Sequence, residues 1–263
     1  MSGASTDSIP VLYEGSDGIG MLTLNNPAKR NALSSPVLQA LKNCLDQIGD
    51  NPEIRVVIIR AAGPVFSSGH DLRELQAGDR ADHAAVFGLA TTVMETIRLL
   101  PQPVIAQVQG MAIAAGCQIV ASCDLAVAAE SARFATPGVR NGLFCTTPGV
   151  ALARAVPRKK AMEMLLTGVP ISAEEALQFG LVNRVVPDEV LEQQTVELAR
   201  HIAKASAYTL SVGKRGFYEQ VSLDYPAAYA VAGDVMTENM QAHDAHEGID
   251  AFLTKRAPEW QGR

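Results

Sequence analysis

The stretch Pro103–Asp124, PVIAQVQGMAIAAGCQIVASCD, decides the fold of this chain. It begins with an apolar run of strand length, Val104–Val108, passes through Gly110 into small residues, and continues as a short helix from Cys117 to Ser122. Small residues at a helix start let a ligand approach the backbone closely. The first N–H groups of a helix lack partners within it and favour negative charge, such as a developing enolate oxygen. The alternative is a tight strand-to-helix turn without a ligand.

A second segment has the same design. Val56–Ala61, VVIIRA, is typical of a strand, and Gly63-Pro64 and the stretch Phe66–Leu72, FSSGHDL, follow it. Small residues and a glycine again separate a strand from a helix start, and Asp71 suits the N-cap of that helix. The repetition favours the ligand-binding interpretation of both turns.

Three motifs in the expected order carry a family resemblance. They are Asn31-Ala32-Leu33-Ser34, Phe66–Leu72, and Pro103–Gly116. Together they resemble the crotonase superfamily, also called the enoyl-CoA hydratase/isomerase family, over nearly the whole chain. The resemblance implies an α/β fold of the ClpP/crotonase type, a spiral of β-β-α units. It further implies a spiral core with the acyl-CoA site over residues 1–200, a helical trimerisation region over 201–263, and a homotrimer or a dimer of trimers.

Hydrophobic periodicity predicts further elements without fixing their arrangement. We expect strands at Ile19–Leu24, Leu125–Ala129 and Arg133–Ala135, and helices at about Pro36–Ile48, Asp82–Leu100 and Lys159–Leu166. Ser172 begins another helix with the spacing of a capping box, and Gly180 ends it. From about Asp188 the pattern is mostly helical, with breaks expected at Pro226 and Gly248. Alternation of strands and helices favours a parallel-rich α/β core.

The resemblance implies that a thioester carbonyl sits between two backbone N–H groups, those of His70 and Ala115. The family's turn usually contains three glycines, whereas this chain has Ala114-Ala115-Gly116. Alanine keeps the N–H but adds a methyl group, so we expect a tighter pocket. The alternative is plain turn geometry.

The family's two catalytic glutamates correspond to Gln118 and Gly138. Glutamine cannot exchange a proton at neutral pH, although it can hold a water molecule, and glycine offers no side chain. Hydration by the usual mechanism is therefore expected to be very slow. Introducing glutamate at both positions should raise the rate if the fold preserves the site geometry.

Other groups are candidates for chemistry. The His70 ring has a near-neutral intrinsic pKa, but it can also simply pack or face solvent. Cys145, in the stretch GLFCTT, is a candidate nucleophile for thioester cleavage. We expect instead that it packs beside Leu143 and Phe144 as a small apolar group lining the acyl pocket. Arg140 either pairs with a substrate carboxylate or lies on the surface.

Contacts with coenzyme A are also implied by the resemblance. Basic groups for its phosphates are Lys29, Arg30 and Arg73, Ala61 and Ala62 lie near the adenine, and Phe252 and Lys255 reach the coenzyme A of a neighbouring subunit. Ser68, Asp71, Leu72, Gly116 and Leu143 complete the expected substrate-binding set. For the isolated basic residues, a solvated surface position is the alternative.

Composition excludes several classes of partner. A net charge of −6 disfavours nucleic acid and anionic membranes, and no apolar run reaches the roughly 18 residues of a membrane helix. The N-terminal stretch MSGASTDSIPVLYEG resembles neither a secretory signal nor a transit peptide, so a cytoplasmic location is expected. The cysteines form no C-x-x-C pair, so no metal site is expected. We expect no cofactor, with coenzyme A present only as part of the substrate.

Three functions follow from these observations. The first is an acyl-CoA enzyme of fatty-acid or related metabolism, classed as an enoyl-CoA hydratase/isomerase (a lyase), with thioester hydrolysis as a variant. The second is a non-catalytic acyl-CoA-binding or scaffold protein, which the loss of both glutamates favours. The third is an unrelated α/β enzyme, but the chain has neither a P-loop nor a G-x-G-x-x-G after a strand.

Overall fold

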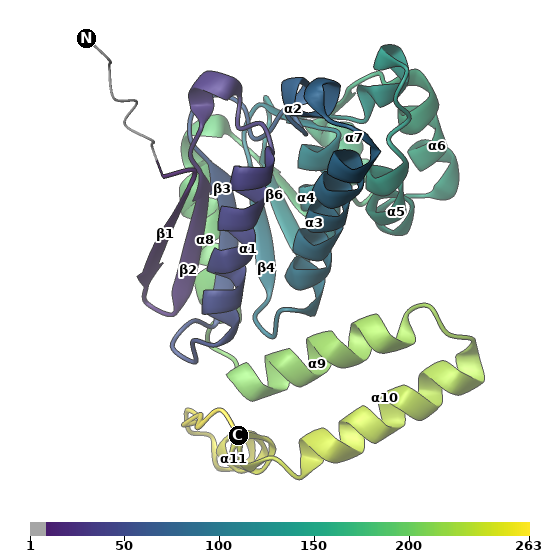
Figure 1. Cartoon of the computed structure of the whole chain (residues 1–263). Helices are drawn as coiled ribbons and strands as arrows, with labels where there is room; N and C mark the ends of the chain where they lie inside the picture. The colour runs from purple at the N-terminus through teal and green to yellow at the C-terminus, as the bar shows by residue number, and fades with distance from the viewer. Residues whose placement is uncertain (1–8) are drawn as a thin grey trace.

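The computed structural model describes residues 9–263, which form two sheets and a set of surrounding helices (Figure 1). The larger sheet has six strands in the order β1-β2-β3-β4-β6-β9, and the smaller has three in the order β5-β7-β8 within the described residues. The strands are β1 (Val11–Ser16), β2 (Ile19–Leu24), β3 (Val56–Ala61), β4 (Val104–Val108), β5 (Met111–Ile113), β6 (Leu125–Ala129), β7 (Arg133–Ala135), β8 (Ile171–Ser172) and β9 (Arg184–Val186). In the larger sheet, β1 is antiparallel to β2 and the other neighbours are parallel.

Successive turns of the chain alternate between the two sheets. After β4 in the larger sheet, the chain adds β5 to the smaller sheet and then forms α4 (Ala115–Ser122). The next turn repeats this with β6, β7 and, after a short 3-10 helix (Pro137–Asn141), α5 (Thr146–Ala155). This repetition confirms the expected α/β spiral of β-β-α units.

Helices cover both faces of the larger sheet. Alternate strand residues such as Val57 and Ile59 pack into one core with α1 (Ser35–Gly49) and α3 (Arg80–Leu99). Their neighbours Val56 and Ile58 pack into a second core with α8 (Leu191–Ile202). Because side chains along a strand alternate between faces, these apolar runs are buried on both sides. The remaining core helices are α2 (Leu72–Ala77), α6 (Arg158–Thr167) and α7 (Ala173–Gln178).

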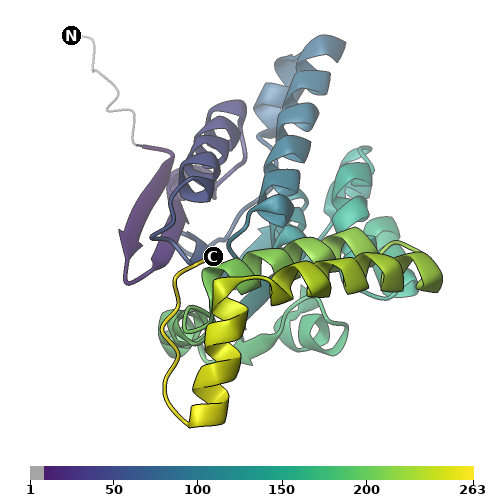
Figure 2. The same cartoon turned by 90° about the horizontal axis from the view of Figure 1, so that it is seen from below.

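Three C-terminal helices, α9 (Ala207–Gln220), α10 (Tyr225–Met240) and α11 (His243–Thr254), lie together beneath the core (Figure 2). An ion pair anchors α9, because Lys214 Nζ lies 2.7 Å from Asp124 Oδ2. The Tyr218 hydroxyl donates to the other oxygen of Asp124 at 2.9 Å. The expected boundary between the spiral core and the trimerisation region, at residue 200, falls in the last turn of α8. That the C-terminal helices form a trimer stays a prediction. Among residues 9–263, no helix combines the length and apolar character needed to cross a bilayer.

Most predicted elements are present, with three differences. The expected break at Gly248 is wrong, because α11 continues through it with the Trp260 ring beside the glycine. The break expected at Pro226 is present but lies just before it: α9 ends at Gln220 and α10 begins at Tyr225, so that Pro226 is in the first turn of α10, where its missing N–H costs nothing. The sequence prediction also omitted α5 and the strands β1, β5, β8 and β9.

Candidate functional site

Backbone hydrogen bonds join two segments from different turns of the spiral. The first loop follows β3 and contains Ser67 to His70, and the second follows β4 and leads into α4 at Ala115. Ser67 N donates to Met111 O at 3.1 Å, and Ile113 N donates to Ser67 O at 2.8 Å. A Cβ atom on Gly116 would lie 2.7 Å from Ser67 O, closer than side-chain carbons approach a carbonyl. Glycine at position 116 therefore allows the two loops to meet.

Asn31 holds the first loop in place, a role that the sequence interpretation did not assign to the Asn-Ala-Leu-Ser motif. Its side chain donates to Ala62 O at 2.9 Å and to Val65 O at 2.8 Å. The Ser67 hydroxyl donates to Asn31 O at 2.9 Å. Asparagine tolerates the left-handed region of backbone conformation, and the φ of Asn31 is 50°. The residue type was therefore the one signal in the sequence that could have indicated this role.

The junction of the two loops brings together two backbone N–H groups. Ala115 is the first residue of α4, so its N–H has no acceptor within the helix. The His70 N–H has no hydrogen-bond acceptor among residues 9–263. A Cβ atom on Gly69 would lie 3.3 Å from Ala115 N, which shows how closely the two loops approach. Such a pair of donors can stabilise a carbonyl oxygen that gains negative charge.

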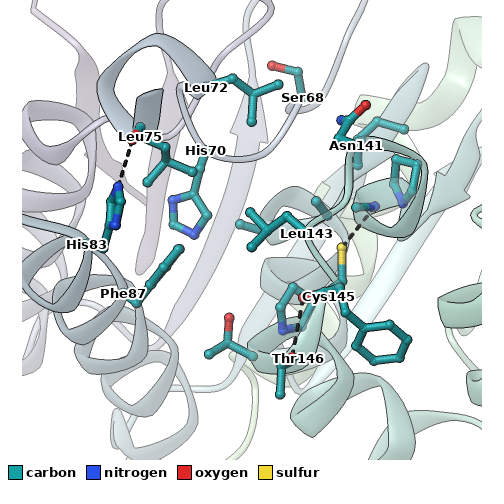
Figure 3. A pocket seen from close by; sticks show the side chains of 18 of the residues that line it. Ser68, His70, Leu72, Leu75, His83, Phe87, Asn141, Leu143, Cys145 and Thr146 are labelled. Carbon is teal, nitrogen blue, oxygen red and sulfur yellow. Dashed lines mark hydrogen bonds between the residues drawn. The ribbon is translucent and has the colours of Figure 1, made fainter. Parts of the chain in front are cut away.

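Beside these donors lies a cavity of about 650 Å³ (Figure 3). Its walls come from the two loops, from α2 and α3, and from the segment 137–148. Of the predicted site residues, it is lined by Ser68, His70, Leu72, Ala115, Gly138, Leu143 and Cys145. In the described part of the chain, no Asp, Glu, Lys or Arg lines it. Beside its apolar residues, the lining includes the polar side chains of Gln76, His83, Asn141, Thr146 and Thr147.

Three predicted residues lie next to the cavity without lining it. Gly116 is buried against Ser67. Asp71 caps α2, as expected, because its carboxylate accepts a hydrogen bond from Arg73 N at 2.9 Å. Gln118 is buried in α4, and its Oε1 has no hydrogen-bond partner in residues 9–263.

The His70 ring packs against the edge of Phe87, with ring centroids 5.4 Å apart. Both ring nitrogens are buried, and neither has a hydrogen-bond partner within the described residues. Burial lowers the pKa of this imidazole, so the ring is neutral at pH 7. The geometry favours a packing role for the side chain, with the backbone N–H as the functional group.

Gly138 is enclosed by the segment that follows it. Leu143 N donates to Gly138 O at 3.0 Å, and Gly138 N donates to Cys145 Sγ at 3.3 Å (Figure 3). A Cβ atom on Gly138 would lie 2.0 Å from Leu143 O and 2.7 Å from Cys145 Sγ. A side chain at position 138 therefore requires the segment 143–145 to move, and the expected gain from glutamates at 118 and 138 stays a prediction that depends on that movement.

Cys145 lines the cavity but is almost fully buried. Burial raises the pKa of its thiol, and the hydrogen bond from Gly138 N opposes that shift only in part. A thiol in this setting is protonated at neutral pH and is a poor nucleophile. Its neighbours Leu143 and Phe144 also line the cavity and are half-exposed.

Several residues predicted to contact coenzyme A lie near the loop that contains His70. Arg30 O accepts a hydrogen bond from Ser68 N at 3.0 Å, which places the exposed Lys29 and Arg30 beside the first loop. Ala61 is the last residue of β3 and Ala62 follows it, and the exposed Arg73 is in the first turn of α2. Phe252 and Lys255 are different, because α11 lies at the bottom of Figure 1 whereas α2, which forms part of the cavity wall, lies at the top. Arg140 does not line the cavity, and its Nε donates to Thr167 O at 3.1 Å.

Known proteins resemble this chain over most of its length. The model of the enoyl-CoA hydratase/isomerase family matches residues 14–263. Enoyl-CoA hydratase domain-containing protein 3 of Homo sapiens is 54% identical over 245 residues, which cover 93% of this chain and 81% of that protein. This agrees with the family resemblance drawn from the sequence motifs.

Solved structures agree with the fold. The crystal structure of the same human protein has a TM-score of 0.93 and 52% identity, covering 95% of this chain and all of that one (100%). An enoyl-CoA hydratase from Mycobacterium smegmatis also has a TM-score of 0.93, with 45% identity over 95% of this chain and 98% of that one.

One expectation is overturned by these relatives. The homologues from Homo sapiens, Mus musculus and Danio rerio are all named mitochondrial proteins, which contradicts the cytoplasmic location predicted from the sequence. That prediction rested on the N-terminal stretch, and residues 1–8 of it lie outside the described residues. With the family model matched over residues 14–263 and a relative 54% identical, the chain belongs to the enoyl-CoA hydratase/isomerase family.

Proposed function

We propose that this protein binds acyl-CoA thioesters in the cavity beside His70 and Ala115. The thioester carbonyl oxygen accepts hydrogen bonds from the two backbone N–H groups, and the acyl group occupies the cavity. The support is the junction of the two loops, where a Cβ atom on Gly116 would lie 2.7 Å from Ser67 O and one on Gly69 would lie 3.0 Å from Ile113 O. Coenzyme A is part of the substrate in this proposal, and no further cofactor takes part.

The coenzyme A moiety lies at the entrance formed by the loops after β2 and β3. Lys29, Arg30 and Arg73 are exposed there and meet the phosphates, since charge-assisted hydrogen bonds to phosphate are strong. Ala61 and Ala62 form the wall for the adenine.

The C-terminal helices supply the remaining contacts through assembly. Their outward surface carries large apolar side chains, among them Tyr225 at 82%, Tyr229 at 76% and Phe252 at 83% exposure. Exposed apolar surface of this extent marks a protein interface. We propose that α9–α11 form a trimer, or a dimer of trimers, in which Phe252 and Lys255 reach the coenzyme A of a neighbouring subunit.

The site does not support hydration by a pair of carboxylates, and the enclosure of Gly138 carries this conclusion. Each missing general acid or base typically costs about 10²- to 10⁴-fold in rate, and in the described chain no carboxylate lines the cavity. Thioester hydrolysis is disfavoured as well, because burial keeps the Cys145 thiol protonated. The geometry supports acyl-CoA binding with very slow hydration.

Two measurements on the purified full chain test the proposal. Calorimetry should show that butyryl-CoA binds and that butyrate binds far more weakly, and equal affinities would refute the thioester site. Crotonyl-CoA should lose its enoyl absorbance at least about a hundredfold more slowly than with a family member that has both glutamates. Rapid hydration would show that other groups supply the acid and the base.

A further inference from the structure

The segment 137–169 is basic in a protein that is acidic as a whole. It contains five lysines and arginines and one glutamate, whereas the whole chain has 22 Lys and Arg against 28 Asp and Glu. The glutamate, Glu163, has its Oε2 3.2 Å from Lys160 Nζ, so these two charges neutralise each other. The four remaining cations are exposed and have no ion pair among residues 9–263; they are Arg140, Arg154, Arg158 and Lys159.

Large apolar side chains are exposed on the same segment. Those between 41% and 58% exposed are Leu143, Phe144, Val150, Met162, Leu166 and Val169. In α6, Arg158, Met162 and Leu166 follow one another at four-residue spacing, so they share one face of the helix. In α5, Arg154 lies one turn after Val150, and its Nη1 donates to Val150 O at 2.8 Å. Cationic and apolar side chains therefore lie side by side on both helices.

Packing contacts join these elements into one surface, the 137–169 surface. A Cβ atom on Gly149 would lie 3.2 Å from Leu165 Cδ1, so α5 and α6 pack directly against each other. Arg140 Nε donates to Thr167 O at 3.1 Å, which connects the 3-10 helix to the end of α6. Helix α6 lies at the outer edge of the molecule, away from the C-terminal helices (Figure 1). The 137–169 surface is therefore separate from the apolar surface of α9–α11.

A surface of this composition fits an anionic lipid bilayer. Its apolar side chains can enter the boundary between headgroups and acyl chains, while the flanking lysines and arginines pair with the lipid phosphates. At 0.1 M salt, charges more than about 10 Å apart are largely screened, so the acidic remainder of the chain opposes this contact only weakly. A helical peptide partner would need a groove, whereas α6 stands at the outer edge of the molecule (Figure 1).

We propose that the 137–169 surface docks this protein onto anionic membranes. The expectation that an acidic chain avoids such membranes used the net charge alone, which does not show this local excess of basic residues. Leu143 and Phe144 belong to the 137–169 surface and also line the cavity, so docking places the cavity next to the bilayer. The inference does not depend on which ligand the cavity binds.

Co-sedimentation of the full chain with lipid vesicles tests the proposal. Vesicles of phosphatidylcholine and phosphatidylglycerol in equal parts should bind the protein at low salt. Raising the salt from about 0.05 to 0.5 M should release most of it, because the attraction between exposed charges is screened. Vesicles of phosphatidylcholine alone should bind it far more weakly.

Reversing two charges on α6 should weaken binding to the anionic vesicles. Each basic side chain near such a surface is worth about fivefold in affinity, so Arg158→Glu with Lys159→Glu should cost about 25-fold or more. The matched control is Arg200→Glu with Lys204→Glu, which changes the net charge equally at exposed positions. These lie at the end of α8 and just after it, and α8 is on the left of Figure 1 whereas α6 is at the right edge. The control should bind within about twofold of the unchanged protein.

A second variant tests the apolar contribution. Met162→Ser with Leu166→Ser should weaken vesicle binding about tenfold or more, because two apolar side chains no longer enter the bilayer boundary, while the salt dependence stays. All substituted positions are exposed, so the variants should fold, and thermal unfolding checks that they do.

Three results would overturn the proposal. They are equal binding to both kinds of vesicle, a control that loses as much affinity as the α6 charge variant, and no binding to anionic vesicles at low salt. The last result would make an acidic protein the better match for the 137–169 surface. Binding that requires anionic lipid, falls with salt and is lost in the α6 variants alone supports the proposal.

Discussion

Replacing Gly138 with alanine tests the enclosure that separates this site from a two-glutamate hydratase. The new Cβ would meet Leu143 O at 2.0 Å. Because a carbon and a carbonyl oxygen need about 3.3 Å, Leu143 must retreat by about 1.3 Å. That movement breaks or strains the hydrogen bond from Leu143 N to Gly138 O and displaces Cys145.

The expected cost follows from these contacts. Overpacking costs about 1–3 kcal/mol, and the weakened hydrogen bond adds about 1 kcal/mol. Alanine restricts the unfolded chain more than glycine does, which offsets the loss of stability by about 0.4–1 kcal/mol. The free energy of unfolding should fall by about 2–3 kcal/mol, which lowers the Tm by about 4–12 °C at roughly 2–4 °C per kcal/mol.

Thermal unfolding of Gly138→Ala, measured by circular dichroism, checks this magnitude. Gly88→Ala is the matched control, because no atom lies within 4 Å of the added Cβ and alanine favours a helix. The control should be neutral or slightly stabilised. A Tm for Gly138→Ala within about 1 °C of the unchanged protein would refute the reasoning. The segment 143–145 would then move aside without a measurable loss of stability.

Three further predictions concern residues at the site. His70→Leu should keep acyl-CoA binding and be as stable at pH 7, since it removes two unpartnered buried nitrogens. Burial lowers the His70 pKa below its unfolded value of 6.5, so protonation favours unfolding, and denaturation from pH 7 to pH 5 should show a smaller stability loss in the variant; an equal loss would contradict this. Ala114→Gly should raise the free energy of unfolding by about 1 kcal/mol by relieving a backbone with φ 48° and ψ −112°; a lower stability in urea would argue against strain. Iodoacetamide should label Cys145 no faster than the partly exposed Cys44, as mass spectrometry can show; fast labelling that acyl-CoA prevents would make thioester cleavage the leading function.

The sequence predicted the parts of the fold that local patterns encode. The strands Val56–Ala61 and Val104–Val108 and the capping box at Ser172 have the predicted bounds or contacts. The short strands β5 and β8 were missed, because each is held in its sheet by pairing with β7, a contact that the local sequence does not encode. Gly248 was misjudged because the Trp260 ring beside it comes from later in the chain.

For the candidate site too, some features were predictable from the local sequence and others depend on contacts between distant segments. The motifs located both loops and the two N–H groups, and Gln118 and Gly138 indicated what was missing. That Gly138 is physically closed could not be predicted, because it depends on the path of residues 143–145. The packing of His70 against Phe87 joins a loop to a distant helix and likewise requires the three-dimensional structure.

Comparing butyryl-CoA with S-butyl-CoA, the thioether that lacks the carbonyl oxygen, tests the central claim most directly. Both ligands carry the same coenzyme A and a four-carbon chain, so calorimetry of the full chain isolates the contacts to that oxygen. Two hydrogen bonds, each with a net worth of about 0.5–1.5 kcal/mol, should make butyryl-CoA bind about tenfold tighter. Equal affinities for the two ligands would contradict the claim that the N–H groups of His70 and Ala115 hold a thioester carbonyl.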